Sequence, residues 1–176
     1  WFFLCDPAGV REYFLGVETM NTQCWIGMPV DQIPTPALVV DVEKLDRNLE
    51  TMANYLARVK TNIRPHAKTH KTPAIAHKQM RAGAVGLCCA TVGEAEVMVY
   101  SGIPEVMIAN EVVDPLSVRR AVNLARQARV LMIVDDPQNV RNIGAAAQQY
   151  GATVDMLVDL DVGQGRCGAR GLEGLV

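Results

Sequence analysis

Short apolar runs recur along this chain, and segments of helical period separate them. The runs are residues 37–42, 85–90, 105–110, 129–136 and 154–162. Because successive positions are apolar, each predicted strand would be buried on both faces, as in a parallel sheet covered by helices. Strand starts that lie about 20 to 25 residues apart leave room for one helix between them. The sequence therefore predicts an α/β protein, and either a doubly wound sheet or part of a (β/α)8 barrel fits the pattern.

Local signals mark where the helices between these strands begin and end. Residues 43–60 carry apolar side chains at helical spacing. Three later helices are expected to begin where a capping residue precedes proline, at Thr72-Pro73, Asp114-Pro115 and Asp136-Pro137. Helix ends are expected at Gly83, Gly102 and Gly151. With a further strand at 63–68, these segments make about five consecutive β/α units.

Polar side chains gather at the predicted carboxyl ends of the strands. They are Lys68, Asn110, Asp135, Asp136, Asp159 and Asp161. Active sites of parallel α/β folds lie at that edge. Asp136 is expected to be a helix cap and Asp135 a turn residue, whereas Lys68, Asn110 and Asp161 have no such structural explanation. The sequence therefore predicts a site at this edge and favours a barrel-like arrangement.

The segment RPHAKTHKTP is rich in cationic groups. On a strand, Arg64, His66 and Lys68 would share one face, and Lys68 would lie at the carboxyl end. A lysine that is partly desolvated among other cations loses its proton more easily, and a neutral amine is what covalent chemistry with a carbonyl requires. A solvated basic turn is the alternative, because Pro65 weakens a strand. A metal site at His66 and His70 is disfavoured, since the two need not share a face.

A second pattern, DLDVGQGRCG, follows the last predicted strand. Gly163, Gly165 and Gly168 match the dinucleotide fingerprint G-x-G-x-x-G, although that fingerprint normally follows the first strand of its unit and opens a helix. The alternative is a loop that brings Arg166 over a ligand. A planar, permanently charged guanidinium suits a phenolate or a carboxylate.

Composition sets further limits on function. The chain has 176 residues, of which 49% are hydrophobic and 20% charged, as in an ordinary globular domain. A formal net charge of -2 gives no global attraction to nucleic acid, and no apolar run reaches the roughly 20 residues that span a bilayer. Five cysteines without a Cys-x-x-Cys pair favour a reducing compartment, so we predict a cytoplasmic location. The adjacent Cys88 and Cys89 are expected to be core residues.

Five segments occur in an order and at separations that resemble one group of enzymes. They are TPALVVDVEKLDRNLETM, RPHAKTHKTP, GAVGLCCATVGEAEV, GIPEVMIANEVV and VDLDVGQGRCG. Together they resemble the N-terminal barrel domain of the D-threonine aldolase and D-serine dehydratase group, which are pyridoxal-phosphate enzymes of the alanine racemase fold type. The resemblance covers about residues 34–169. It implies a partial (β/α)8 TIM barrel, with a C-terminal β-domain absent from this chain.

The resemblance also implies roles for three residues. Lys68, in HAKTHK, would carry pyridoxal 5'-phosphate covalently and be the catalytic residue. Arg166, in GQGRCG, would lie by the phenolic oxygen of the cofactor, and His66 would be a near neighbour by position only. No metal ligand is assigned within this chain. The divalent ion expected in the full-length protein (Mn, Mg or Zn) would have its ligands beyond Val176.

The implied activity is that of a lyase on D-3-hydroxy amino acids, foremost a D-threonine aldolase-like retro-aldol cleavage to glycine and an aldehyde. Alternatives within the group are D-serine dehydration to pyruvate and ammonia, and cleavage of 3-hydroxy-D-aspartate. An amino-acid racemase and a non-catalytic pyridoxal-phosphate-binding protein are further alternatives. The expected partners are a small-molecule D-amino acid and, at full length, a second copy in a homodimer, with no nucleic acid and no membrane.

Both ends of the sequence predict an incomplete protein. The chain begins with Trp1, and Met20 is a candidate start, so residues 1–19 are candidates for non-native sequence within an N-terminal extension at 1–33. The cofactor-binding barrel domain is assigned to 34–176. Because its pocket would be unfinished, this fragment alone is predicted to be inactive.

Overall fold

The computed structural model describes residues 2–6, 9–11 and 25–171. Met20 and most of residues 1–19, within the predicted extension at 1–33, lie outside the described residues. Internal contacts divide the chain into two compact units, residues 1–63 with 72–84, and residues 64–71 with 85–176. The second unit holds both of the motifs that carry the predicted chemistry, HAKTHK and GQGRCG.

The first unit contains a small sheet and two helices. Its elements are β1 (Phe2–Asp6), β2 (Gly9–Arg11), η2 (Val30–Gln32), β3 (Leu38–Asp41), α1 (Val42–Val59) and α2 (Pro73–Arg81). The strand order is β2-β1-β3, with β1 antiparallel to β2 and parallel to β3. The carboxylate of Asp41 caps α1 by accepting a hydrogen bond from the Lys44 N–H at 3.0 Å. The predicted strand at 37–42 and helix at 43–60 are therefore confirmed, while the pairing of β3 with β1 was not foreseen.

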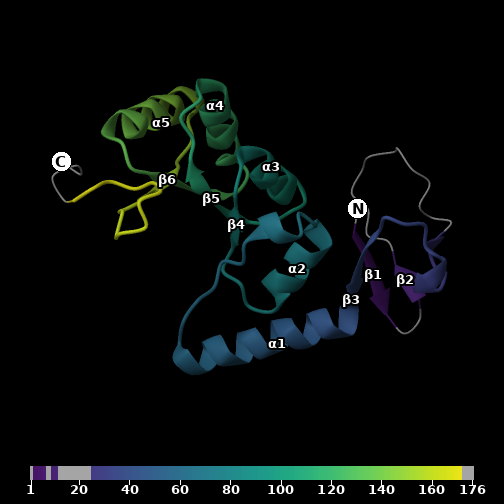
Figure 1. The fold of residues 1–176 in the computed structure, drawn as a ribbon. Helices are drawn as coiled ribbons and strands as arrows, with labels where there is room; N and C mark the ends of the chain where they lie inside the picture. Colours follow the sequence, from purple (N-terminus) through teal and green to yellow (C-terminus); the bar gives the residue numbers. More distant parts are fainter. Residues whose placement is uncertain (1, 7–8, 12–24, 172–176) are drawn as a thin grey trace. The chain divides into compact units, whose positions relative to one another are not determined.

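The second unit is a four-stranded parallel sheet in the order β4-β5-β6-β7. Its elements are η3 (Ala67–Thr69), β4 (Leu87–Cys89), α3 (Val92–Tyr100), β5 (Glu105–Glu111), α4 (Pro115–Leu124), β6 (Arg129–Val134), α5 (Pro137–Tyr150) and β7 (Asp155–Val158). Helices α3, α4 and α5 lie side by side along one face of the sheet (Figure 1). Parallel strands that follow chain order, each joined to the next by a helix, confirm the α/β class and the partial barrel.

The core of the second unit lies between the sheet and these helices. Val106, Ile108 and Met132 are completely buried. Met107 and Ile133 alternate with them, point to the other face of the sheet and are only partly buried. The adjacent cysteines of β4 are also core residues, as predicted, with exposed fractions of 7% and 0%. Helices therefore cover one face of the sheet. The other face is the one that would line the inside of a barrel.

The proline signals for helix starts are confirmed. Helices α2, α4 and α5 begin at Pro73, Pro115 and Pro137. The Asp136 carboxylate accepts hydrogen bonds from the N–H groups of Gln138 at 2.7 Å and Asn139 at 2.9 Å, so this residue is a helix cap, as expected.

The strand predicted at 63–68 is reduced to a single bridge. His66 pairs with Cys88, and the Pro65 carbonyl accepts a hydrogen bond from the Cys88 N–H at 2.8 Å. Proline has no N–H to donate, so the ladder does not extend on that side. From Ala67 the backbone turns into η3. Lys68 therefore lies in a turn after the bridge, and the predicted strand alternation does not reach it.

A row of alternating charges crosses the amino ends of the strands in this unit. Glu105 accepts hydrogen bonds from Arg64 through Oε1 and from Arg129 through Oε2, both at 2.9 Å. Arg129 also donates to Asp155 at 2.6 Å. Gly86 leaves room for this contact, because a Cβ there would lie 3.0 Å from Glu105 Oε1. The row therefore lies at the amino-terminal end of the strands, and the predicted site lies at their carboxyl-terminal end.

Acid is expected to weaken this row. Burial acts to raise the pKa of Glu105, but hydrogen bonds from Arg64 and Arg129 outweigh it, and the pKa falls below the ordinary 4.5. Because the folded pKa is below the unfolded one, the stabilisation is complete above about pH 4.5 and is lost as the pH falls through the folded pKa. We expect Glu105→Gln to lower the free energy of unfolding by about 1–3 kcal/mol at neutral pH, and by less in acid.

Urea denaturation at neutral pH and at about pH 3.5 measures this difference. Glu96→Gln is the matched control, because Glu96 pairs with Arg120 between two helices, where the arginine side chain is 45% exposed. Glu96→Gln should lower the free energy of unfolding by no more than about 1 kcal/mol. If the Glu105→Gln deficit were the same at both pH values, the proposed linkage to the Glu105 carboxylate would be wrong.

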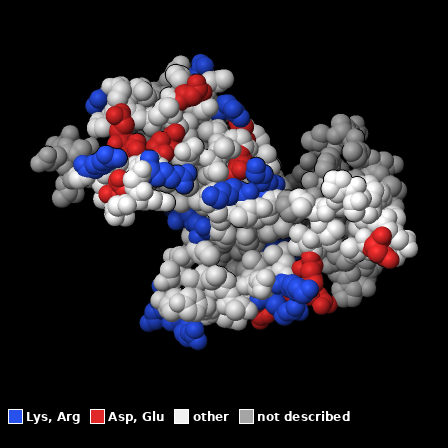
Figure 2. All heavy atoms as spheres, viewed as in Figure 1, with Lys and Arg blue, Asp and Glu red and all other residues white. Residues whose placement is uncertain are grey.

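Charged groups are otherwise mixed on the surface. Basic and acidic side chains are interspersed over the described residues on the face shown in Figure 2. Among the helices of the described residues, none combines the length and the apolar character needed to cross a bilayer.

Candidate functional site

Lys68 lies in a tight turn that its own neighbours hold. The imidazole Nδ1 of His66 accepts a hydrogen bond from the Lys68 N–H at 3.3 Å. The Thr69 hydroxyl donates to the His66 carbonyl at 3.1 Å, and the Lys71 N–H donates to the Ala67 carbonyl at 2.7 Å. These bonds fix the backbone on both sides of Lys68, while its side chain is exposed.

His66 is suited to this role because it stays neutral. Burial, and then the positive charge of Lys68, lower the pKa of His66 below the ordinary 6.5, although the Glu94 carboxylate opposes them. A neutral imidazole has one nitrogen free to accept a hydrogen bond. His66 therefore acts on the backbone of Lys68, and its predicted place beside a cofactor remains a prediction.

Glu94 ties the lysine turn to the connection between β4 and α3. Its Oε2 accepts a hydrogen bond from the Ala90 N–H at 2.7 Å, and its own N–H donates to the Thr91 hydroxyl at 3.2 Å. Its Oε1 lies 3.5 Å from Lys71 Nζ. Lys71 has a φ of 51°, which is uncommon for lysine. Sequence reasoning missed Glu94, although Thr-x-x-Glu at 91–94 is a capping-box signal.

The two side chains predicted to bind the cofactor directly are available for binding. Within the described part of the chain, the Lys68 amine and the Arg166 guanidinium make no hydrogen bond or ion pair, and both side chains are exposed. The partial desolvation expected for Lys68 is therefore not seen. Lys68 follows the bridge to β4 and Arg166 follows β7, so both lie beyond the carboxyl ends of parallel strands. An unpaired amine and an unpaired guanidinium fit a cofactor with an aldehyde and a phenolic oxygen.

The glycine pattern does not form a dinucleotide site. The N–H groups of Gly163 and Gly165 donate to Asp161 Oδ1, at 3.0 and 2.9 Å. In a dinucleotide site these amides would bind the pyrophosphate, but here an internal carboxylate occupies them. No helix follows this loop within the described residues. The alternative of a loop that carries Arg166 is the one that fits.

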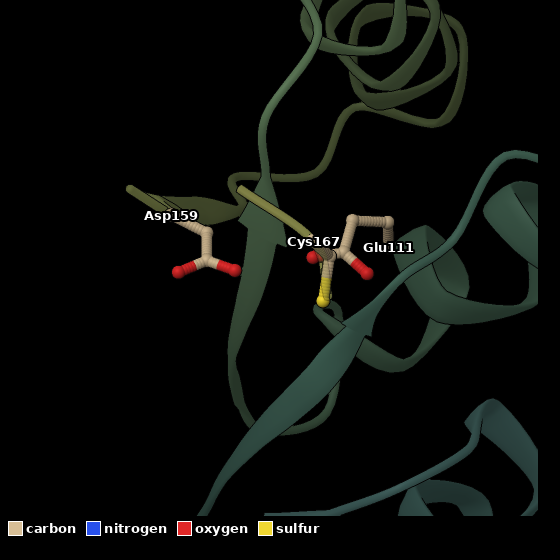
Figure 3. A group of neighbouring side chains, drawn as sticks. All are labelled: Glu111, Asp159 and Cys167. Carbon is tan, nitrogen blue, oxygen red and sulfur yellow. The ribbon is translucent and has the colours of Figure 1, made fainter. Parts of the chain in front are cut away.

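Three potential metal ligands lie together beside this loop (Figure 3). Glu111 ends β5, Asp159 follows β7, and Cys167 lies in the loop, with one oxygen or sulfur atom of each within 4.8 Å of the others. Burial, and then the charge of Glu111, raise the pKa of Cys167, so the thiol holds its proton in this arrangement. Among the described residues this is the only group of three that could hold an ion. His66 and His70 do not belong to it.

Comparison with known proteins agrees with this geometry. Residues 40–175 match the family described as "Alanine racemase, N-terminal domain". The chain is 43% identical over 142 residues to a D-threonine aldolase of an Arthrobacter species, covering 81% of this chain and 38% of that protein. It is 38% identical over 152 residues to a 3-hydroxy-D-aspartate aldolase of Paracoccus denitrificans, covering 85% and 39%. The chain thus spans about two fifths of the length of these relatives.

Solved structures give the same result. The D-threonine aldolase from Filomicrobium marinum superposes with a TM-score of 0.80 at 45% identity, over 83% of this chain and 40% of that one. The D-threo-3-hydroxyaspartate dehydratase from Delftia sp. superposes with a TM-score of 0.69 at 28% identity, over 79% and 37%. The fold and the enzyme group inferred from the five sequence segments are confirmed. This chain therefore belongs to the alanine racemase N-terminal domain family.

Proposed function

We propose that this chain is the cofactor-binding part of a pyridoxal-phosphate-dependent lyase that cleaves D-3-hydroxy amino acids, foremost D-threonine, to glycine and an aldehyde. One observation carries the proposal. An exposed, unpaired amine in HAKTHK follows a parallel bridge to β4, and an exposed, unpaired guanidinium in GQGRCG follows β7 of the same sheet, in a chain 43% identical to a D-threonine aldolase. When bound, pyridoxal phosphate supplies an electron sink for the bond that breaks.

The residues of the chain have separate tasks in this proposal. Lys68 holds the cofactor through Nζ and is the catalytic residue. Arg166 binds the phenolic oxygen with its guanidinium, which cannot lose its charge near neutral pH. His66 fixes the backbone of Lys68 through Nδ1. The turn and the loop therefore set where the amine and the guanidinium stand, which is the orientation that the cofactor chemistry needs.

The metal, the assembly and the location are also proposals. We propose a divalent ion (Mn, Mg or Zn) in the full-length protein, with ligands outside this chain. One solved form of the related dehydratase is a cysteine-to-alanine mutant described as metal-free, which supports metal dependence in the group. A homodimer and a cytoplasmic location are proposed as well. The free thiols of Cys88, Cys89 and Cys167 fit a reducing compartment.

The test uses protein expressed from its complete reading frame, loaded with pyridoxal phosphate and a divalent ion. D-threonine should yield glycine and acetaldehyde in equal amounts, with L-threonine as the control substrate. A chelator should remove most of the activity, and added metal should restore it, because a Lewis acid on the β-hydroxyl assists cleavage.

Other products would assign one of the alternatives. A 2-oxo acid and ammonia, from D-threonine or D-serine, would identify a dehydratase, and the 29% identity to the Delftia dehydratase is the observation that favours this second candidate. Conversion of D-threonine to L-allo-threonine, the product of inversion at Cα alone, would identify a racemase. Cofactor binding with no turnover of any of these substrates would leave a non-catalytic binding protein and overturn the proposal.

A further inference from the structure

Asp161 lies at the centre of the loop that carries Arg166. Its Oδ1 accepts hydrogen bonds from both Gly163 and Gly165, at 3.0 and 2.9 Å, and only 11% of its side chain is exposed. These two bonds curl the backbone around the carboxylate. Arg166 follows directly after the second of the two bonded glycines.

The backbone that follows Arg166 is held in place as well. The Gly168 N–H donates to the Asp135 carboxylate at 3.0 Å, which anchors the loop to the end of β6. Asp161 N–H donates to the Ala169 carbonyl at 3.1 Å, closing the base of the loop. The backbone of Arg166 is therefore fixed one residue before it and two residues after it, and both fixed points depend on an aspartate.

We propose that Asp161 is the positioning residue of Arg166, which holds the loop in the shape that lets the guanidinium reach the cofactor. The inference rests on the proposed function, because that function gives Arg166 its task. In this role Asp161 does not touch the cofactor. It acts by keeping the Gly163 and Gly165 amides turned inward, which sets the direction in which Arg166 leaves the loop.

The charge of Asp161 suits this role. Hydrogen bonds from Gly165 and Gly163 lower the pKa of Asp161 below its ordinary value, so the carboxylate is ionised at neutral pH and accepts strongly. Arg170 is the cation nearest to it, at 3.7 Å, but its side chain is 84% exposed and screened by water. The two backbone amides are therefore the main partners of this carboxylate.

The test compares Asp161→Ala and Asp161→Asn in protein expressed from its complete reading frame. Hydrogen exchange of the Gly163 and Gly165 amides is measured first, without cofactor. Asp161→Ala should speed exchange at both amides by about tenfold or more, since a hydrogen bond to a charged acceptor is lost at each. Asp161→Asn keeps an acceptor oxygen and should restore most of the protection. Unchanged protection in Asp161→Ala would refute the inference, whatever the cofactor does.

Cofactor affinity is the second readout, measured by absorbance titration with pyridoxal phosphate. Asp161→Ala should weaken the affinity by about tenfold, and Asp161→Asn by about threefold or less. Asp136→Ala is the matched control. That residue also accepts two backbone N–H bonds, but at the start of α5, so its loss should leave the affinity within about twofold of wild type.

The double variant Asp161→Ala with Arg166→Ala separates positioning from a general structural effect. If Asp161 acts through Arg166, its removal should change the affinity of Arg166→Ala by no more than about twofold. A full tenfold loss in that background would refute the inference. If wild type binds no cofactor, or Arg166→Ala binds as tightly as wild type, the assignment of Arg166 fails, while the amide exchange still reports whether Asp161 shapes the loop.

Discussion

Lys68→Ala is expected to abolish covalent attachment of pyridoxal phosphate and to lower turnover of D-threonine by on the order of a thousandfold or more. Attachment joins Lys68 Nζ to the aldehyde carbon with loss of water, so without the amine no bond can form. The loss should not come from misfolding, because the Lys68 side chain is exposed and makes no hydrogen bond or ion pair among the described residues. Borohydride reduction followed by peptide mass analysis measures the attachment, and thermal unfolding checks the fold.

Lys71→Asn is the matched control. It removes an amine three residues away in the same turn, and asparagine tolerates the positive φ of 51° at that position better than most residues do. The variant loses the ion pair to Glu94, in which the lysine side chain is 67% exposed, so its effect on stability should be small. Attachment should persist at Lys68. The assignment of Lys68 would be wrong if the cofactor attached covalently to Lys68→Ala as well as it does to wild type. It would also be wrong if the cofactor were found on Lys71 in the wild-type protein.

Gly168→Ala is expected to open the Arg166 loop and to weaken cofactor affinity by about tenfold or more. A Cβ at this position would lie 2.5 Å from the backbone nitrogen of Asp161 and 2.7 Å from the Leu160 carbonyl carbon. Both are backbone atoms, so neither can move aside as a flexible side chain would. Gly168 also has a φ of 100°, which alanine adopts only with strain.

Gly171→Ala is the control that separates the steric clash of the new Cβ from the backbone strain of a positive φ. Gly171 has a φ of 78°, but a Cβ there would meet nothing within 4 Å. It lies beyond the closed loop, so its replacement should cost some stability and leave cofactor affinity almost unchanged. Affinity titrations and thermal unfolding of the two variants check this expectation. Equal losses of affinity would mean that backbone strain, and not the packing of Gly168 on Asp161, controls the loop.

Much of the architecture was predictable because its signals are local. The prolines at 73, 115 and 137 mark helix starts, since proline lacks only an N–H that the first turn of a helix does not use. Apolar runs on both faces of the predicted strands correctly indicated a parallel sheet. The strand at 63–68 failed for an equally local reason, because Pro65 cannot extend a ladder and the His66 side chain then caps a turn.

The site was less predictable, because one of its anchoring contacts joins distant residues and the others depend on the local path of the backbone. The sequence predicts Asp135 to be a turn residue, yet its carboxylate anchors Gly168, which lies 33 positions further along the chain. Asp161 stood out as a polar residue at a strand end, but its bonds to the following glycines cannot be read from residue types alone. Those bonds decide between the two interpretations of G-x-G-x-x-G, since the same amides cannot serve both a phosphate and an internal carboxylate.

The row formed by Arg64, Glu105, Arg129 and Asp155 also encodes strand order. Glu105 lies between Arg64 and Arg129, and Arg129 lies between Glu105 and Asp155, so acidic and basic side chains alternate along the row. Exchanging the places of β5 and β6 would bring Arg129 toward Arg64 and Glu105 beside Asp155, so like charges would meet in a half-buried layer. A strand inserted out of order would therefore place like charges side by side, so the charges at the amino-terminal edge of this sheet favour the observed strand order over the exchanged one.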